Sequence, residues 1–258
     1  MRKKYSHDDI EKWADYSGDR NNIHFDKSIA VKNGLRDVIV QGMLILLDAK
    51  IALSRSIVTD SEVSFFIKKP VIIDTDVDFS IREVNHKKIL TVHEVNEPKS
   101  VCVTANVLPQ KAPELIDKKY QMRVSEEFVN NYIDILRKYY PNIQVDWILL
   151  DTLLFCISFN QQKADYFHRQ ALKLTGNNEI SDITTFHVAQ KLFIAKNMTN
   201  SSGLHFQNMS FIVEEKDIYI HDDSAYSAFN ISVIEDEKVV FQSSMGCLTK
   251  LSTGYKGN

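Results

Sequence analysis

Apolar residues recur with a helical period near the start of the chain. Ile10, Trp13 and Ala14 stand at positions i, i+3 and i+4 and predict one buried face of a short helix. Ser6, with an acidic residue three places on, predicts the N-cap of this helix. The turn-prone tripeptide Ser17-Gly18-Asp19 then ends the helix. A second short helix is expected at Lys27–Lys32, stopped by an Asn-Gly pair.

The densest apolar segment, GMLILLDAKIAL, covers Gly42–Leu53. Only Asp48 and Lys50 interrupt it, so we expect a helix that is buried on nearly all sides. Alternating, β-branched segments follow and predict antiparallel strands. They cover Val63–Ile67, Thr75–Val84, Lys88–Val95 and Val101–Val107.

The second half of the chain repeats this order of elements. A polar segment with two prolines, Pro109–Lys119, is predicted to be a linker. It is followed by an expected helix at Glu126–Tyr140, a strongly apolar stretch at Val145–Phe159, and a run of strands. The strands are expected at Thr184–Ile194, Leu204–Val213, Ser227–Val233 and Lys238–Leu248. We therefore predict a tandem repeat, with domains at residues 1–110 and 120–258 and an insertion or mobile loop at Asn160–Glu179.

The composition of the chain mainly excludes some classes of protein and of site. A chain of 258 residues with net charge -3 and 44% hydrophobic residues is typical of a globular protein and has no nucleic-acid-binding character. No apolar run is long enough to span a bilayer and no signal peptide is evident, so we expect a cytoplasmic protein without a membrane partner. Cys102, Cys156 and Cys247 are widely separated, which favours buried thiols over disulfides or a zinc site.

The segment WADYSGDRNNIHFD, from Trp13 to Asp26, carries the candidate chemistry. Asp19 and His24 lie in a turn region, where a carboxylate and an imidazole can converge on one small volume and share a water molecule. Addition of water to a C=C bond, or its elimination, needs one group that takes a proton and one that gives it. Taken alone, such a pair is more often two solvated turn residues.

The surrounding residues resemble the signature of the MaoC-like dehydratases, the hot-dog-fold group that includes the (R)-specific enoyl-CoA hydratases. The resemblance rests on Ser17–Asp26 (SGDRNNIHFD), on Gln41-Gly42-Met43-Leu44 and on Val63–Val71 (VSFFIKKPV), and it covers roughly residues 5–110. Three positions depart from the family pattern: Asn22 replaces a proline, Gln41 replaces a histidine, and Asp74-Thr75 replaces a Gly-Asp turn.

The resemblance implies an α+β fold: a double hot-dog, with two tandem antiparallel sheets each wrapped around a central helix. It also implies that Asp19 and His24 activate and deliver water and that Asn21 braces their loop. Gly42 would offer its backbone N–H to the thioester carbonyl, a role that suits the unpaired N–H groups at a helix N-terminus. The remaining expected substrate-binding residues are Gln41, Met43, Leu44 and Leu47. Leu44, Leu47 and Ile51 could line a tunnel for the acyl tail, although residues of this kind are more often plain core.

The second half contains no matching S-G-D-x-N-x-x-H segment. Its histidines, His168, His187, His205 and His221, are scattered, and His187 is interpreted as an ordinary core or surface residue of a strand. We therefore expect one active site, in the first half, and a degenerate second half that shapes the acyl pocket.

The function that follows is a hydratase/dehydratase (a hydro-lyase) that interconverts trans-2-enoyl and (R)-3-hydroxyacyl thioesters in fatty-acid or polyketide metabolism. Coenzyme A and acyl carrier protein are both open as carriers, and no metal or organic cofactor is expected. Basic residues that could dock a carrier protein are Lys32, Arg36, Lys68 and Lys69. The alternatives are a non-catalytic acyl-thioester-binding accessory subunit and a hot-dog thioesterase. Further assembly into a homodimer of double hot-dogs is left open.

Overall fold

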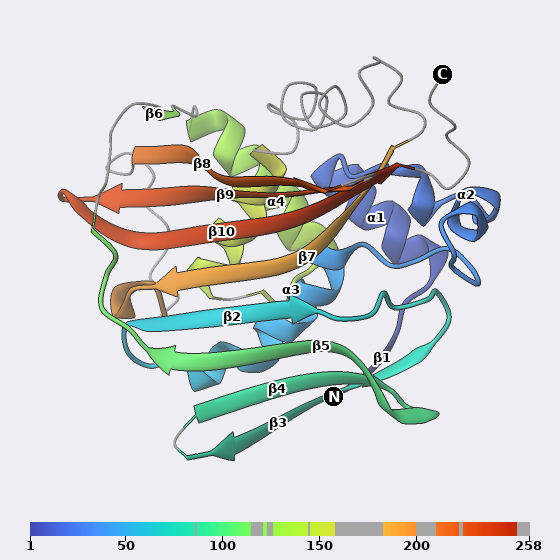
Figure 1. Ribbon diagram of the computed structural model, residues 1–258. Coiled ribbons are helices and arrows are strands. Elements are labelled where there is room, and N and C mark those ends of the chain that lie inside the picture. The colour runs from blue at the N-terminus through green and yellow to red at the C-terminus, as the bar shows by residue number, and fades with distance from the viewer. Residues whose placement is uncertain are drawn as a thin grey trace.

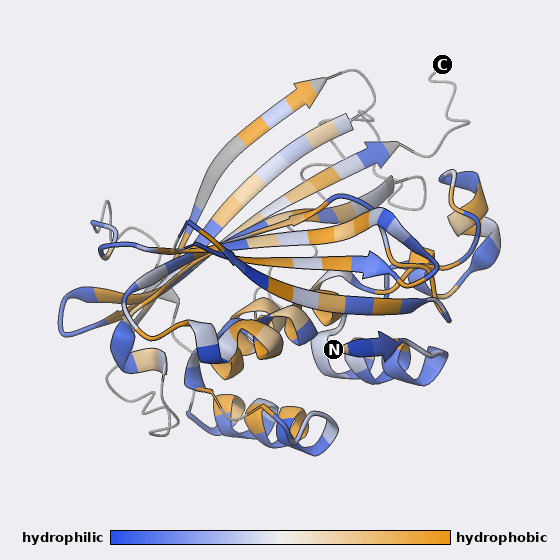
Figure 2. Cartoon of the chain, turned by 90° about the horizontal axis from the view of Figure 1, so that it is seen from below, coloured by the Kyte–Doolittle hydropathy of each residue, from blue (hydrophilic) through white to orange (hydrophobic). Residues whose placement is uncertain are grey.

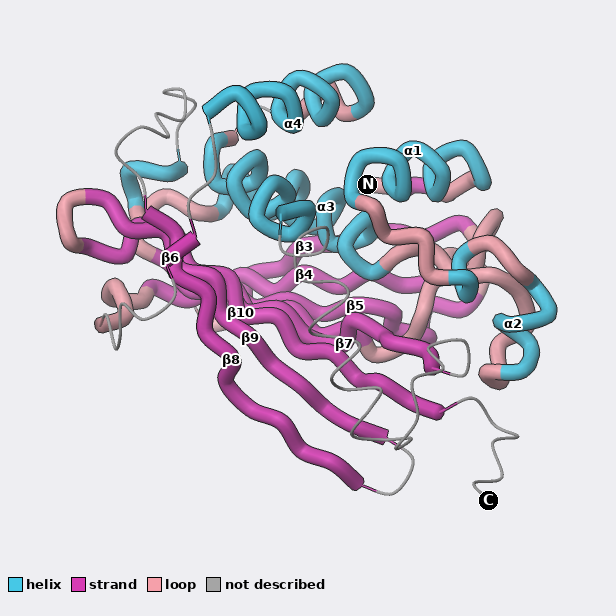
Figure 3. Tube along the Cα trace, turned by 90° about the horizontal axis from the view of Figure 1, so that it is seen from above, coloured by secondary structure: helices cyan, strands magenta, loops and turns pink. Residues whose placement is uncertain are grey.

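One antiparallel sheet of ten strands forms the body of the protein, and helices α1, α3 and α4 lie on one side of it (Figures 1 and 3). The computed structural model describes residues 1–85, 87–114, 121–122, 126–143, 145–157, 183–199, 210–221 and 224–251. Within these residues, no helix is both long and apolar enough to cross a bilayer.

The first half of the chain supplies five strands and most of the short helices. Its elements are β1 (Arg2–Lys4), α1 (His7–Ser17), η1 (Asn22–His24), α2 (Lys27–Lys32), α3 (Gly42–Leu53), η2 (Ser54–Ser56), β2 (Ser61–Ile67), β3 (Asp76–Val84), β4 (Lys87–Glu94) and β5 (Glu97–Pro109).

The second half supplies the other five strands. Its elements are β6 (Gln121–Met122), α4 (Glu126–Tyr139), a helix over residues 146–157, β7 (Ile183–Ile194), η4 (Lys196–Thr199), β8 (Ser210–His221), β9 (Ser224–Glu235) and β10 (Lys238–Leu251).

The order of strands is symmetrical about the centre of the sheet. It runs β1-β3-β4-β5-β2-β7-β10-β9-β8-β6, so each strand of the first half has a counterpart at the mirrored place in the second. β2 and β7 join the halves by antiparallel pairing from Ser61 opposite Ile194 to Phe66 opposite Ala189. The described fold is thus α+β with a hot-dog arrangement in each half, as the sequence predicts.

A single large core runs beneath both halves. It includes α3, which is buried along nearly its whole length, and the helix of residues 146–157. Figure 2 shows the apolar residues of the helices gathered beneath the sheet. The fully buried members include Leu44, Val63, Phe65, Trp147 and Phe241, which come from both halves.

Most predicted elements are confirmed, and the differences have physical reasons. The strand expected at Leu204–Val213 instead covers Ser210–His221 in the described residues, because the charged residues in its middle, EEKD, interrupt the strand pattern. β1 was missed because three basic residues in a row look like a solvated segment. The expected linker begins after Pro109, which still belongs to β5. The predicted loop at Asn160–Glu179, and residues 204–209, lie outside the described part of the chain.

Candidate active site

The loop between α1 and α2 is built by local hydrogen bonds. Ser6 and Asp9 form the capping box that starts α1, and Gly18 ends α1 in the left-handed conformation, with φ 77°. The Asp19 N–H then donates to Ser17 Oγ at 3.1 Å. Asn21 caps η1, its side chain accepting from the Ile23 N–H at 3.4 Å. This sequence of caps fixes the backbone on which both candidate catalytic side chains stand.

Asp19 and His24 meet across this loop. Asp19 Oδ2 lies 3.8 Å from His24 Nε2, and both side chains are largely buried, with 14% and 8% exposed. The distance is too long for a direct hydrogen bond but suits one water molecule that bonds to both groups. The structure therefore brings together the two residues that the motif singled out.

The tautomer of His24 follows from its other nitrogen. Nδ1 lies 2.8 Å from the carbonyl oxygen of Ile39. A carbonyl oxygen only accepts, so Nδ1 carries the hydrogen and neutral His24 presents a bare Nε2 toward Asp19. An unprotonated Nε2 is the form that can take a proton from water.

The N-terminus of α3 supplies a second polar group. Gln41 is the N-cap and makes no side-chain cap hydrogen bond, while Gly42 is the first helical residue and is partly exposed. The Gly42 N–H has no acceptor within the helix and sits at its positive end. The side chain of Gln41 is fully buried and donates to the Ile10 carbonyl at 3.1 Å, so it ties α3 to α1.

The three apolar residues expected to touch substrate lie in the main core. Met43, Leu44 and Leu47 are each at most 2% exposed and belong to the cluster shared by both halves. Their placement fits the core interpretation, and their contact with an acyl chain stays a prediction.

The second half contributes directly to the site through β7, which begins at the end of the sheet nearest α1 and α2 (Figure 1). Asn21 Nδ2 donates to the carbonyl of Thr185 at 3.3 Å, so a brace of the catalytic loop comes from the other half. On β10, burial and then the charge of Asp19 raise the pKa of Cys247 to about 12, so this thiol is held protonated beside the site.

His187 on β7 is the residue that sequence reasoning missed. A Cβ added to Gly42 would lie 3.2 Å from His187 Cβ and 3.0 Å from Ile67 Cδ1, so both side chains pack against the start of α3. Burial, followed by the charge of Lys50, lowers the pKa of His187 to about 4, which keeps the ring neutral. No local motif marks this histidine, because its position depends on β2 pairing with β7.

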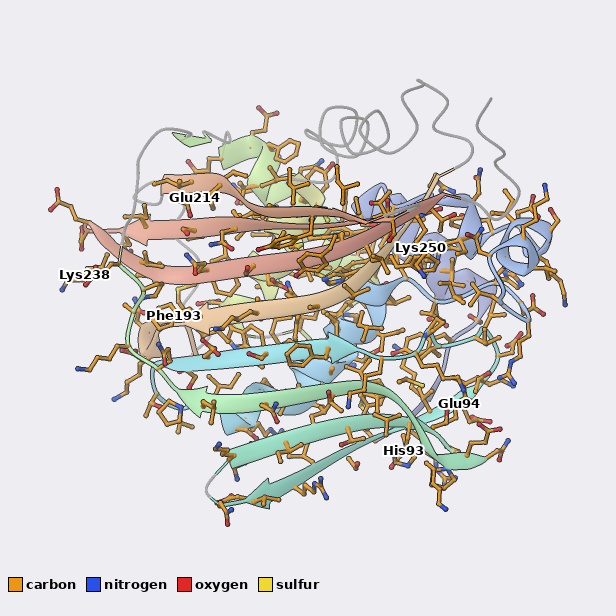
Figure 4. The ribbon with its side chains drawn as sticks, viewed as in Figure 1. His93, Glu94, Phe193, Glu214, Lys238 and Lys250 are labelled. Carbon is orange, nitrogen blue, oxygen red and sulfur yellow. The ribbon has the colours of Figure 1, made fainter. Side chains whose placement is uncertain are left out.

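The basic residues considered for carrier docking are partly neutralised. Lys69 Nζ lies 2.9 Å from a carboxylate oxygen of Glu94, and Arg36 lies 3.7 Å from the other oxygen. Figure 4 shows Glu94 at the end of β4, beside His93. Two of the four predicted docking residues are thus engaged with a carboxylate. Among the residues that the structure describes, no three His, Cys, Asp or Glu side chains are grouped to hold a metal ion.

Comparison with known families now adds to this geometry. Residues 2–105 match the model of the MaoC like domain. Over these residues the chain is similar to a MaoC-like dehydratase domain. The match covers the loop of Asp19 and His24, the whole of α3, strands β2–β4 and β5 up to residue 105. No curated protein matches the chain in sequence.

Solved structures that resemble the chain share little sequence with it. The dehydratase domain of the polyketide PpsC from Mycobacterium tuberculosis has a TM-score of 0.46 and 7% identity, covering 83% of this chain and 85% of that chain. An acyl-CoA thioesterase II from Mycobacterium marinum has a TM-score of 0.46 and 10% identity, with 85% and 92% covered. The (R)-hydratase from A. caviae involved in PHA biosynthesis has a TM-score of 0.32 and 19% identity, with 42% and 88% covered.

Proposed function

We propose that the protein hydrates trans-2-enoyl thioesters to (R)-3-hydroxyacyl thioesters, or catalyses the reverse dehydration, with the carrier being coenzyme A or acyl carrier protein. The observation that carries the proposal is the pair of Asp19 Oδ2 and His24 Nε2, which lie 3.8 Å apart and can both bond to one water molecule, while His24 Nδ1 is held by the Ile39 carbonyl. The active site is assigned to residues 1–110, with residues 120–258 as a degenerate half that completes it.

The chemistry starts with the thioester carbonyl at the Gly42 N–H. This hydrogen bond draws electrons toward the carbonyl oxygen and leaves the β-carbon electrophilic. The water held by Asp19 and His24 then attacks the β-carbon, and His24 Nε2 takes one of its protons. An enolate oxygen develops at the start of α3, where the helix dipole and the free N–H stabilise its charge.

The second step returns the proton. The imidazolium of His24 delivers it to the α-carbon, so one water has been added across the double bond and the ring is neutral again. The Asp19 carboxylate orients the water through a hydrogen bond and stabilises the imidazolium while it exists. Asn21, anchored on the Thr185 carbonyl, keeps the loop in the geometry that both steps need.

The test is hydration of crotonyl-CoA, followed by loss of the absorbance of the conjugated enoyl thioester. We expect Asp19→Asn and His24→Ala each to lower kcat/KM by about 100-fold or more, the usual effect of losing a general acid or base. Asp8→Asn and His7→Ala are matched controls, because both residues lie exposed in the first turn of α1. Activity that survives both site substitutions would refute the mechanism.

Two further measurements separate the alternatives. Release of free thiol, followed with a thiol reagent, would show a thioesterase. If crotonyl-CoA is not turned over, crotonyl-acyl carrier protein is the next substrate, and binding of both thioesters without turnover would show a non-catalytic accessory subunit.

A further inference from the structure

His187 has a buried ring nitrogen that the proposed mechanism leaves unused. Its Nε2 lies 2.9 Å from the carbonyl oxygen of Ala189, which can only accept, so Nε2 carries the ring hydrogen. Nδ1 is then a bare acceptor. It is buried and has no hydrogen-bond donor among the described residues. Buried acceptors are rarely left unpaired in native proteins, so this one calls for a donor from a water molecule or from a ligand.

The backbone of β7 is shaped to aim this ring. In the pairing with β10, Gly246 is opposite Ala189 and Cys247 is opposite His187, so Val188 is an extra residue that forms a β-bulge. Bulges re-aim side chains and are common beside active sites. The result is that Nδ1 lies 3.5 Å from the position a Gly42 Cβ would take, beside the N–H proposed to bind the thioester carbonyl. Ile67 Cδ1 contacts the same position, and the end of that side chain can turn aside for a ligand.

The chemistry of the substrate limits what the donor can be. The acyl part of an enoyl thioester has no N–H or O–H group. The carrier arm has amide N–H groups, and the first of them is two carbons from the thioester sulfur in both coenzyme A and acyl carrier protein. In an enoyl thioester it is therefore the donor nearest to a carbonyl bound at Gly42, and the 3-hydroxyl of a hydroxyacyl thioester belongs to the Asp19–His24 pair in the proposed mechanism.

We propose that His187 is a substrate-contacting residue donated by the second half of the chain, and that its Nδ1 accepts a hydrogen bond from the first amide N–H of the thioester's carrier arm. The inference rests on the proposed function for the placement of the carbonyl at Gly42. It assigns the degenerate half a part in selecting arm-bearing thioesters over simple alkyl thioesters, and it applies equally to both carriers.

The test compares two small substrates that differ in this amide. Crotonyl-N-acetylcysteamine has the N–H, and S-butyl thiocrotonate lacks it. We expect the wild type to prefer the first by about tenfold in kcat/KM, the order of effect of one hydrogen bond to a buried acceptor. His187→Leu should abolish the preference by slowing only the amide-bearing substrate.

Two conservative variants separate this role from a structural one. Asn can place an amide oxygen near the position of Nδ1, whereas Gln can place an amide nitrogen near that of Nε2 and keep the bond to Ala189. The inference predicts that His187→Asn keeps the preference and His187→Gln loses it; the reverse pattern would show a purely structural clamp and overturn it. His93→Leu, on β4 in the first half (Figure 4), is the control for loss of a histidine from a strand.

Binding separates failure of this inference from failure of the proposed function. Butyryl-N-acetylcysteamine and S-butyl thiobutyrate, which cannot be hydrated, are titrated by ligand-observed NMR. An amide preference that depends on His187 would uphold the inference even if no thioester is hydrated. Equal binding of the two compounds, or binding of neither, would overturn it.

Discussion

A buried ion pair between the two central helices gives the sharpest test of how the halves are joined. Lys50 on α3 pairs with Asp151 on the helix of residues 146–157, and both side chains are 0% exposed. Gln190 on β7 donates to the other oxygen of Asp151 at 2.8 Å and also donates to Ser243 Oγ on β10 at 2.9 Å. Removing either charge leaves its partner in the interior without a counter-ion, which is strongly destabilising.

The Asp151→Asn variant removes the carboxylate that is the counter-ion of Lys50. Burial lowers the pKa of Lys50 and the charge of Asp151 opposes that shift, so without the carboxylate the folded protein is expected to hold Lys50 neutral. Giving up a proton at pH 7 from an unfolded pKa of about 10.4 costs at most about 4.6 kcal/mol. The folded chain then binds one proton fewer than the unfolded chain, so the variant's stability rises with pH by about 1.36 kcal/mol per unit.

The Lys50→Met variant should show the opposite sign. The buried Asp151 must now take up a proton, at a cost of at most about 4.2 kcal/mol at pH 7 from an unfolded pKa of about 3.9. The folded chain binds one proton more than the unfolded chain, so stability falls as pH rises, by about 1.36 kcal/mol per unit. Gln190 keeps its bond to the carboxyl in this variant and reduces the cost below that limit.

Urea unfolding at several pH values between 6 and 9 measures both slopes relative to the wild type. The double variant Lys50→Met/Asp151→Asn is the control, because it removes both charges and should show neither slope. It should also be more stable at pH 7 than either single variant, since neutral replacements of a buried pair are often tolerated. Single variants with the same pH slope, or a double variant less stable than both, would refute the reasoning.

Three smaller changes test the loops around the site. Asn22 is the first residue of η1 and follows a residue with ψ 126°, a geometry that accepts proline. Asn22→Pro should therefore raise the free energy of unfolding by about 0.4–1 kcal/mol. An unchanged urea midpoint would contradict this. Gly42→Ala puts a methyl group 3.0 Å from Ile67 Cδ1 and 3.2 Å from His187 Cβ. The rate of crotonyl-CoA hydration should therefore fall by about tenfold or more. Wild-type activity in this variant would argue against substrate approach at Gly42. Asp74 has φ 59°, in the left-handed region. Asp74→Gly should relieve this backbone strain and raise the free energy of unfolding by about 0.5 kcal/mol. A lower thermal midpoint would show that the Asp74 side chain stabilises the fold by more than the strain costs.

Local chemistry made much of the first half predictable from sequence. The cap at Ser6 and the left-handed turn at Gly18 each depend on residues within one or two turns of the chain. The same holds for the loop that carries Asp19 and His24, whose bracing bonds, apart from the one to Thr185, come from neighbours in sequence or from Ile39. Even Asp74, at the position of an expected glycine turn, adopts the left-handed φ that such a turn requires.

Contacts between the halves could not be predicted, because they depend on strand register. The ion pair joins Lys50 to Asp151 across 101 residues. Each of the two apolar helices contains two charged residues, and the sequence does not show which of them pair. His187 reaches Gly42 only because β2 pairs with β7 and an extra residue, Val188, turns the strand there. One slip of register would move such a side chain to the other face of the sheet. Periodicity gives the strands but not this register.

These contacts show how a half that lacks the S-G-D-x-N-x-x-H motif can still support the candidate active site. β7 pairs with β2, its Thr185 carbonyl holds Asn21, and its His187 packs on Gly42. On the side of the second half, each of these contacts uses the backbone or a residue that the S-G-D-x-N-x-x-H pattern does not include. The absence of that pattern from the second half is therefore compatible with the support that this half gives to the candidate site. The requirement on the second half is one of geometry at the start of β7, which similarity to the catalytic motif cannot reveal.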